Sequence, residues 1–138
     1  MIPPDPLAGR CLCGAIRFAF DPPAIWVLHC HCESCRRATA SPMTSFVSVA
    51  DTRLRWSGTP ATFASSPGVE RGFCGTCGSP VFYRYDGKPH ETHLYAALLE
   101  DPAAVTPEGH DFVEERIAWM HPLPGTRART DTQPEGPT

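Results

Sequence analysis

Short stretches in which apolar and polar residues alternate follow one another along most of the chain, separated by proline and glycine. Near the start, a turn opens into a strand over residues 9–20, where Ile16, Phe18 and Phe20 fall on one face of an extended backbone. The same alternation predicts strands over 24–28, 44–49, 53–56, 61–64, 69–73, 80–85 and 92–97. It predicts a polar turn or one helical turn over 36–41, and a strand or irregular extended segment over 111–119. The fold class expected from this pattern is mainly β.

The composition fits one small domain. The chain has 138 residues, of which 41% are hydrophobic, and it contains 16 prolines and 11 glycines. These values allow a single compact core and favour short strands over long helices. The expected domain spans residues 9–124. Residues 1–8 are expected to be a loose lead-in, and residues 125–138 a disordered tail, because no large apolar residue follows Leu123.

Charge and hydropathy argue against two classes of partner. The formal net charge is -3, and charges of both signs are scattered along the chain without the basic stripe of a nucleic-acid binder. No stretch approaches the roughly 18 to 20 apolar residues that cross a bilayer, and the N-terminal residues lack the pattern of a signal peptide. We therefore expect a cytoplasmic protein that binds neither nucleic acid nor a membrane.

Seven cysteines fall into three clusters. The clusters are C-x-C at 11–13, C-x-C-x2-C at 30–35 and C-x2-C at 74–77. In a reducing compartment these spacings are typical of metal ligands rather than of disulfides, and an odd number of cysteines cannot pair completely. Four thiolates fill a tetrahedral zinc site, whereas three leave one position open. Seven cysteines therefore predict one closed and one open zinc site.

The spacing favours one division of the cysteines between these sites. The C-x2-C turn followed by Gly78 and Ser79 is typical of a zinc knuckle, and the C-x-C-G run at 11–14 is its natural complement. The quartet, which would hold a structural zinc, is Cys11, Cys13, Cys74 and Cys77. The trio, which would hold a second zinc with one face open, is Cys30, Cys32 and Cys35. A competing assignment closes one site with Cys11, Cys13, Cys30 and Cys32 and leaves Cys35, Cys74 and Cys77 open.

Histidines next to the trio are alternative zinc ligands. His29 and His31 alternate with Cys30 and Cys32 along the chain. In an extended backbone, neighbouring side chains point to opposite faces, so the histidines would point away from these two sulfurs. His90, His93 and His121 have no partner nearby in the sequence and are expected at the surface.

Four segments carry a resemblance to a known family. They are G-R-C-L-C-G-A-I-R-F at 9–18, H-C-H-C-E-S-C-R-R at 29–37, S-S-P-G-V-E-R-G-F-C-G-T-C-G-S-P at 65–80 and H-D-F-V-E-E-R-I-A-W at 110–119. Together they resemble the GFA family, which comprises the glutathione-dependent formaldehyde-activating enzyme and the related centromere protein V domain. The resemblance runs from about residue 7 to residue 124 and includes all seven cysteine positions in order.

The resemblance implies an Mss4-like β fold stabilised by zinc, two zinc ions per chain and carbon–sulfur lyase activity. The prototype reaction forms S-(hydroxymethyl)glutathione from glutathione and formaldehyde. Carried over position by position, the quartet holds the structural zinc, whereas the trio holds the second zinc and is catalytic. The sequence leaves open whether the second zinc is bound permanently.

The expected partner is a small thiol such as glutathione, which carries two carboxylates. Arginines near the trio are therefore candidate anion binders, because a guanidinium matches a carboxylate in charge and shape. Arg36 directly follows the trio and is the first candidate for substrate binding, ahead of Arg37 and Arg71.

Other positions near the trio bear on proton transfer and loop shape. Glu33, His31 and His110 are candidate proton shuttles that the sequence does not rank. The family often has glycine where this chain has Ala40, and alanine resists positive φ, so we expect a differently shaped loop there.

Two other functions compete with the lyase. The first is a zinc-stabilised module that binds glutathione or a protein and catalyses nothing. The second is a thiol redox protein that uses Cys74 and Cys77, which is less favoured because the chain lacks a βαβ pattern. The sequence does not indicate which thiol and electrophile are handled, nor an oligomeric state.

Overall fold

The structure is a computed structural model that describes residues 5–121 and 127–129. These residues form short strands, one α-helix and several 3-10 turns. The elements are β1 (Leu7–Arg10), β2 (Arg17–Phe20), β3 (Trp26–Cys30), α1 (Glu33–Thr39), β4 (Thr44–Ala50), β5 (Leu54–Ser57), β6 (Ala61–Ser66), β7 (Val69–Phe73), β8 (Pro80–Tyr85), β9 (Glu91–Tyr95), β10 (Gly109–Asp111) and β11 (Arg127–Arg129). The 3-10 turns span Asp51–Arg53, Ala96–Leu98, Pro102–Ala104 and Val113–Glu115.

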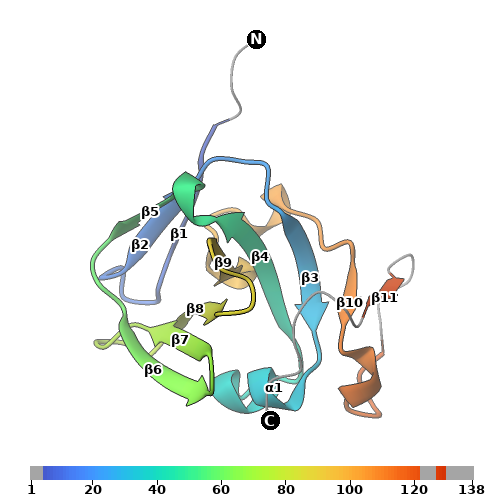
Figure 1. Cartoon of the computed structure of the whole chain (residues 1–138). Coiled ribbons are helices and arrows are strands. Elements are labelled where there is room, and N and C mark those ends of the chain that lie inside the picture. Colours follow the sequence, from blue (N-terminus) through green and yellow to red (C-terminus); the bar gives the residue numbers. More distant parts are fainter. Residues whose placement is uncertain (1–4, 122–126, 130–138) are drawn as a thin grey trace.

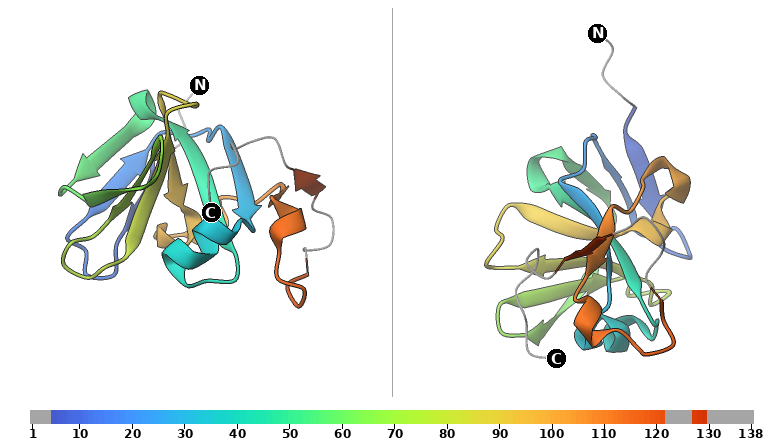
Figure 2. Two further views of the ribbon diagram at one scale, coloured as in Figure 1. Left: turned by 60° about the horizontal axis from the view of Figure 1, so that its bottom comes forward. Right: turned by 90° about the vertical axis from the view of Figure 1, so that its right-hand side faces the viewer.

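The strands form two sheets (Figure 1). The smaller sheet has the order β1-β2-β5, and the larger has the order β11-β10-β3-β4-β9-β8-β7-β6. Neighbours are antiparallel except at one edge of the larger sheet, where β10 is parallel to both β3 and β11. Figure 2 shows α1 and the 3-10 turn after β10 side by side at one end of the molecule. The backbone N–H of Glu33 donates to Glu115 Oε1 at 3.0 Å, which joins these two segments.

The larger sheet separates two hydrophobic cores. Alternate residues of β3 and β4 point to opposite faces, as the pleat requires, so Val27 and Val47 enter the first core and Leu28 and Phe46 enter the second. The first core also contains Phe18 of the smaller sheet and two cysteines of the quartet. The second core contains all three cysteines of the trio. The two cysteine clusters therefore belong to different cores of one small domain.

The prediction of a mainly β protein is confirmed, and β7 and β8 have the predicted bounds. Helix α1 differs from the predicted turn at 36–41, because it begins at Glu33, inside the second cysteine motif. The predicted segment 111–119 contains the end of β10 followed by a 3-10 turn. Phe63, which an apolar alternation would bury, is 47% exposed.

The ends of the chain add two observations. Strand β1 begins at Leu7, inside the segment expected to be a lead-in. Most of the expected tail at 125–138 lies outside the described residues, which include only 127–129 of it as β11. Within the described part of the chain, no helix is long and apolar enough to cross a membrane.

Candidate metal centres

The quartet brings together sulfurs from two distant knuckles. Cys11 and Cys13 follow β1, and Cys74 and Cys77 follow β7. The Sγ atoms of Cys11 and Cys13 are 3.7 Å apart, those of Cys13 and Cys74 are 3.8 Å apart, and all four lie within 4.8 Å of one another. Sulfurs placed tetrahedrally around zinc at about 2.3 Å are about 3.8 Å apart. The quartet therefore fits a tetrahedral metal ion of this size.

Backbone geometry around the quartet is that of a metal knuckle. Backbone N–H groups of Ile16 and Cys77 donate to the sulfurs of Cys11 and Cys74 at 3.3 and 3.4 Å. Gly14 and Gly78, which follow the two knuckles, have φ of +82° and +81°. A side chain at such a φ would be strained, so glycine is required for the tight turn. The N–H groups stabilise negative charge on the sulfurs before any metal binds.

Ser79 connects the two halves of the quartet. Its Oγ accepts a hydrogen bond from the backbone N–H of Leu12 at 3.0 Å, which leaves its own proton for Cys77 Sγ at 3.2 Å. The hydrogen bond from Ser79 is the main cause that lowers the pKa of Cys77 to about 5. Cys77 is thus held as a thiolate, the form that binds metal.

The trio is a compact group within one strand end and one helix. Cys30 ends β3, Cys32 is the N-cap of α1, and Cys35 lies in the first turn of that helix. The sulfur of Cys32 accepts the N–H of Cys35 at 3.2 Å, so it caps the helix as a serine oxygen would. The three sulfurs lie within 4.8 Å of one another, and Cys32, the most exposed of the three, is only 9% exposed. The trio can hold a metal ion with three protein ligands.

One member of the trio carries the negative charge. Hydrogen bonds from the thiols of Cys30 and Cys32, together with the charge of Arg71, lower the pKa of Cys35 well below its ordinary value. Arg71 NH2 lies 3.6 Å from Cys35 Sγ. Burial, with the charge on Cys35, raises the pKa of Tyr83 and of Tyr95. Both phenols are therefore protonated hydrogen-bond donors beside the trio.

The sulfurs gather into the two groups that the spacing favoured, and the competing assignment is not the one that the fold forms. Neither His29 nor His31 joins the trio. His29 Nδ1 lies 2.7 Å from Ser45 Oγ, and His31 Nε2 lies 2.8 Å from His110 Nδ1. Burial and the neighbouring His110 lower the pKa of His31 to about 4, so His31 is neutral at pH 7.

The arginine that contacts the trio is Arg71 of β7. Arg36, the first candidate from the sequence, lines a different cavity of about 520 Å³ with Ile117 and Trp119. Arg37 forms an exposed ion pair with Glu33 at 3.3 Å. Glu33, one of the candidate proton shuttles, is therefore engaged with Arg37. Sequence reasoning ranked Arg71 low and missed Tyr83 and Tyr95, because these residues lie on β7, β8 and β9, far from the trio in the sequence, and meet it only through the packing of the fold.

Ala40 has a left-handed backbone, with φ of 55°, and it is the C-cap of α1. The expectation of a different loop shape rested on the resistance of alanine to positive φ. The structure instead shows alanine in the conformation that glycine would adopt. The loop therefore carries local strain.

One family model matches the chain, and two known proteins are similar to it. The sequence model of the family described as glutathione-dependent formaldehyde-activating enzyme (GFA) matches residues 6–115. The chain is 26% identical over 108 residues to an uncharacterised lyase of Schizosaccharomyces pombe, across 78% of this chain and 79% of that protein. It is also similar to the crystal structure of a Rhodobacter sphaeroides protein, with a TM-score of 0.54 and 24% identity, over 72% of this chain and 91% of the other. The last similarity concerns the fold alone.

Proposed function

Because the chain belongs to the glutathione-dependent formaldehyde-activating enzyme family, we propose that it is a zinc-dependent carbon–sulfur lyase. Its substrates would be adducts of glutathione or a similar small thiol, with S-(hydroxymethyl)glutathione as the prototype. In the direction of synthesis, a bond forms between the thiol sulfur and the carbonyl carbon, and the proton lost by the thiol ends on the former carbonyl oxygen. The lyase name of the yeast relative supports this reaction class.

The observation that carries the proposal is the buried trio, which offers three sulfur ligands where the quartet offers four. In this proposal Cys11, Cys13, Cys74 and Cys77 would hold a structural zinc, and Cys30, Cys32 and Cys35 would hold the second. Zinc held by three thiolates lowers the pKa of an incoming thiol or polarises a carbonyl oxygen, which is the chemistry that the reaction needs.

The surrounding side chains have separate tasks. The Arg71 guanidinium, in contact with Cys35 Sγ, stabilises negative charge on the trio. Tyr83 and Tyr95 lie in the same core as the trio, where their protonated hydroxyls can donate to an oxygen that gains negative charge. The apolar residues of that core exclude water and strengthen these interactions. His31 and His110 form a pair of their own, and we assign them no step.

Exchange NMR on a mixture of glutathione and formaldehyde tests the lyase. We expect the protein to accelerate interconversion above the uncatalysed rate, and Cys32→Ser to remove the acceleration. Serine is a good N-cap, so this variant should retain α1 and the fold, as circular dichroism would verify. If the protein binds glutathione but leaves the exchange rate unchanged, the chain is the non-catalytic binding module instead.

A further inference from the structure

Arg71 is held in one orientation by several contacts. Its Nε donates to Ser65 Oγ at 3.1 Å, and its NH2 donates to Ser34 Oγ at 3.0 Å as well as approaching Cys35 Sγ. The guanidinium carbon lies 5.0 Å from the centre of the Tyr83 ring. The residue is only 3% exposed. A cation fixed in this way has lost its rotational freedom before any ligand binds.

One nitrogen of this guanidinium, NH1, takes part in none of these hydrogen bonds. Arg71 NH1 is buried and forms no hydrogen bond of good geometry among the described residues, although the phenol of Tyr95 interacts with the guanidinium. A buried donor without an acceptor costs about 1 to 3 kcal/mol, more when it is charged, so native proteins rarely leave one. Among the described residues, no anion lies within hydrogen-bond distance of NH1, and an anion would suit this position best.

Arg71 lines a cavity of about 340 Å³ between β6, β7 and α1. The residues that line it are Ala38, Thr62, Phe63, Arg71, Gly72, Phe73, Gly78, Pro80 and Tyr95. Arg71 is the one charged residue among them, and none is acidic. The cavity thus combines apolar walls, two hydroxyl groups and a single buried cation.

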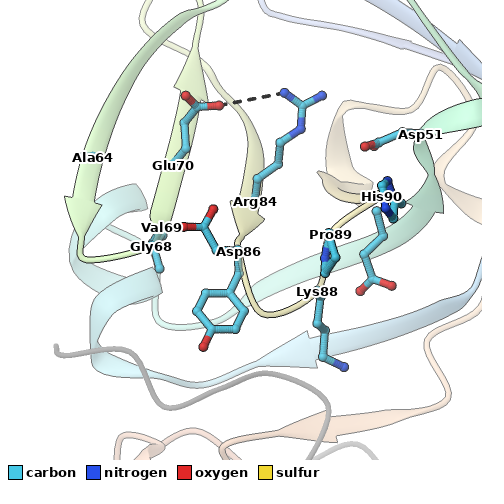
Figure 3. Close-up of a pocket in the computed structure, with 12 residues that line it drawn as sticks. Asp51, Ala64, Gly68, Val69, Glu70, Arg84, Asp86, Lys88, Pro89 and His90 are labelled. Atoms are coloured by element: carbon cyan, nitrogen blue, oxygen red, sulfur yellow. Dashed lines mark ion pairs between the residues drawn. The ribbon is translucent and has the colours of Figure 1, made fainter.

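A larger cavity elsewhere on the protein has the opposite character. It measures about 510 Å³ and contains four carboxylates, those of Asp51, Glu70, Asp86 and Glu91 (Figure 3). Three of these already have partners within the protein: Glu70 pairs with Arg84, Asp51 accepts from Thr92, and Glu91 pairs with His93. Arg84 and Lys88, which also line this larger cavity, are only partly buried, so it lacks a fully buried cation like Arg71.

We propose that the Arg71 cavity is a carboxylate-binding subsite that receives an acidic end of the thiol substrate. The proposal rests on the proposed function for the identity of that thiol. Arg71 both contacts a trio sulfur and lines the cavity, so a ligand with its sulfur at the trio would span a short distance to place its carboxylate in the cavity. A guanidinium binds carboxylate through charge-assisted hydrogen bonds, and a buried one discriminates strongly against an ester.

Position 38 allows a test that leaves Arg71 and its contact with Cys35 in place. Ala38 lies one helical turn after Ser34, whose hydroxyl accepts from Arg71, so a longer side chain at 38 would reach the same guanidinium. Ala38→Glu would place a carboxylate in the subsite, and Ala38→Gln is the uncharged control of equal size. Titration calorimetry on the zinc-loaded protein would compare glutathione with its diethyl ester, and the glycyl monoethyl ester would identify the carboxylate.

We expect the unmodified protein to bind glutathione at least about tenfold more tightly than the diester, as one charge-assisted hydrogen bond would give. Ala38→Glu should reduce this preference to about twofold or less, and Ala38→Gln should retain it. Equal affinity for the two ligands, binding of neither, or a preference that survives Ala38→Glu would overturn the subsite. The lyase is judged separately by exchange NMR. A carboxylate preference without accelerated exchange refutes the lyase alone, and accelerated exchange without a carboxylate preference refutes the subsite alone.

Discussion

Ser79 is a single residue on which the chemistry of the quartet depends. Its hydroxyl accepts from Leu12 in one knuckle and donates to Cys77 in the other. Groups that hydrogen-bond to metal ligands in this way typically affect metal affinity by about 10- to 100-fold. The effect should depend on pH, because the hydrogen bond lowers the pKa of Cys77 to about 5.

We therefore predict that Ser79→Ala weakens zinc binding at the quartet by roughly 10- to 100-fold. Without its donor, Cys77 would have a higher pKa, protons would compete with zinc, and the loss of affinity should grow as the pH falls below 7. Competition with a chromophoric chelator at several pH values measures this. Ser57→Ala, at an exposed serine of β5, is the control. A variant with unchanged affinity at pH 6 would show that Ser79 has no such role.

The residues of the site divide into those that the sequence could reveal and those that it could not. The cysteines were predictable because C-x2-C and C-x-C place ligands within one turn, and the glycine after each knuckle marks its backbone conformation. The contact of Arg71 with Cys35 was not predictable, because the two residues are 36 positions apart and belong to different elements. Tyr83 and Tyr95 reach the trio through the same long-range packing.

At the scale of elements, prediction succeeded where turns on both sides isolate a strand. Strands β7 and β8 lie between turn signals and have the predicted bounds. Helix α1 starts earlier than predicted because its N-cap is Cys32, and helix-capping rules do not favour cysteine. Strand β10 depends on parallel pairing with β3, which lies 81 positions earlier at the pair His29 and His110. Local sequence pattern carries no signal for such a pairing.

Ala40 at the C-cap of α1 gives a testable consequence at this scale. Alanine in the left-handed conformation is strained, and glycine is not, so Ala40→Gly should raise the free energy of unfolding by about 0.5 to 1 kcal/mol. In contrast, Ala38→Gly within the same helix should lower it by about 1 kcal/mol. Urea denaturation of the zinc-loaded proteins, followed by circular dichroism, compares the two. Equal destabilisation by both substitutions would contradict a strained C-cap.

At the scale of the whole molecule, metal ions at the quartet and at the trio would stabilise different parts of the fold. The quartet joins two knuckles, and Cys13 and Cys74 are 61 positions apart in the sequence. The trio lies within the six residues 30–35, between the end of β3 and the first turn of α1. A metal ion at the quartet closes a long loop and connects the smaller sheet to the larger one, whereas a metal ion at the trio constrains only a short segment that the second core already packs.

Metal removal should therefore have two distinct stages. We predict that a strong chelator first removes the zinc of the trio, without loss of the β-sheet signal in circular dichroism. Removal of the zinc from the quartet should then unfold the domain, because a structural zinc contributes on the order of 10 kcal/mol to the folding of a small domain. Cys35→Ser should bind one zinc and stay folded, whereas Cys74→Ser should fail to fold stably. Zinc content and circular dichroism, measured together during chelation, follow both stages. The trio should lose its metal ion first, because three sulfurs with one exchangeable position release a metal ion faster than four sulfurs do. If both ions and the fold were instead lost in a single step, the trio would be as structural as the quartet.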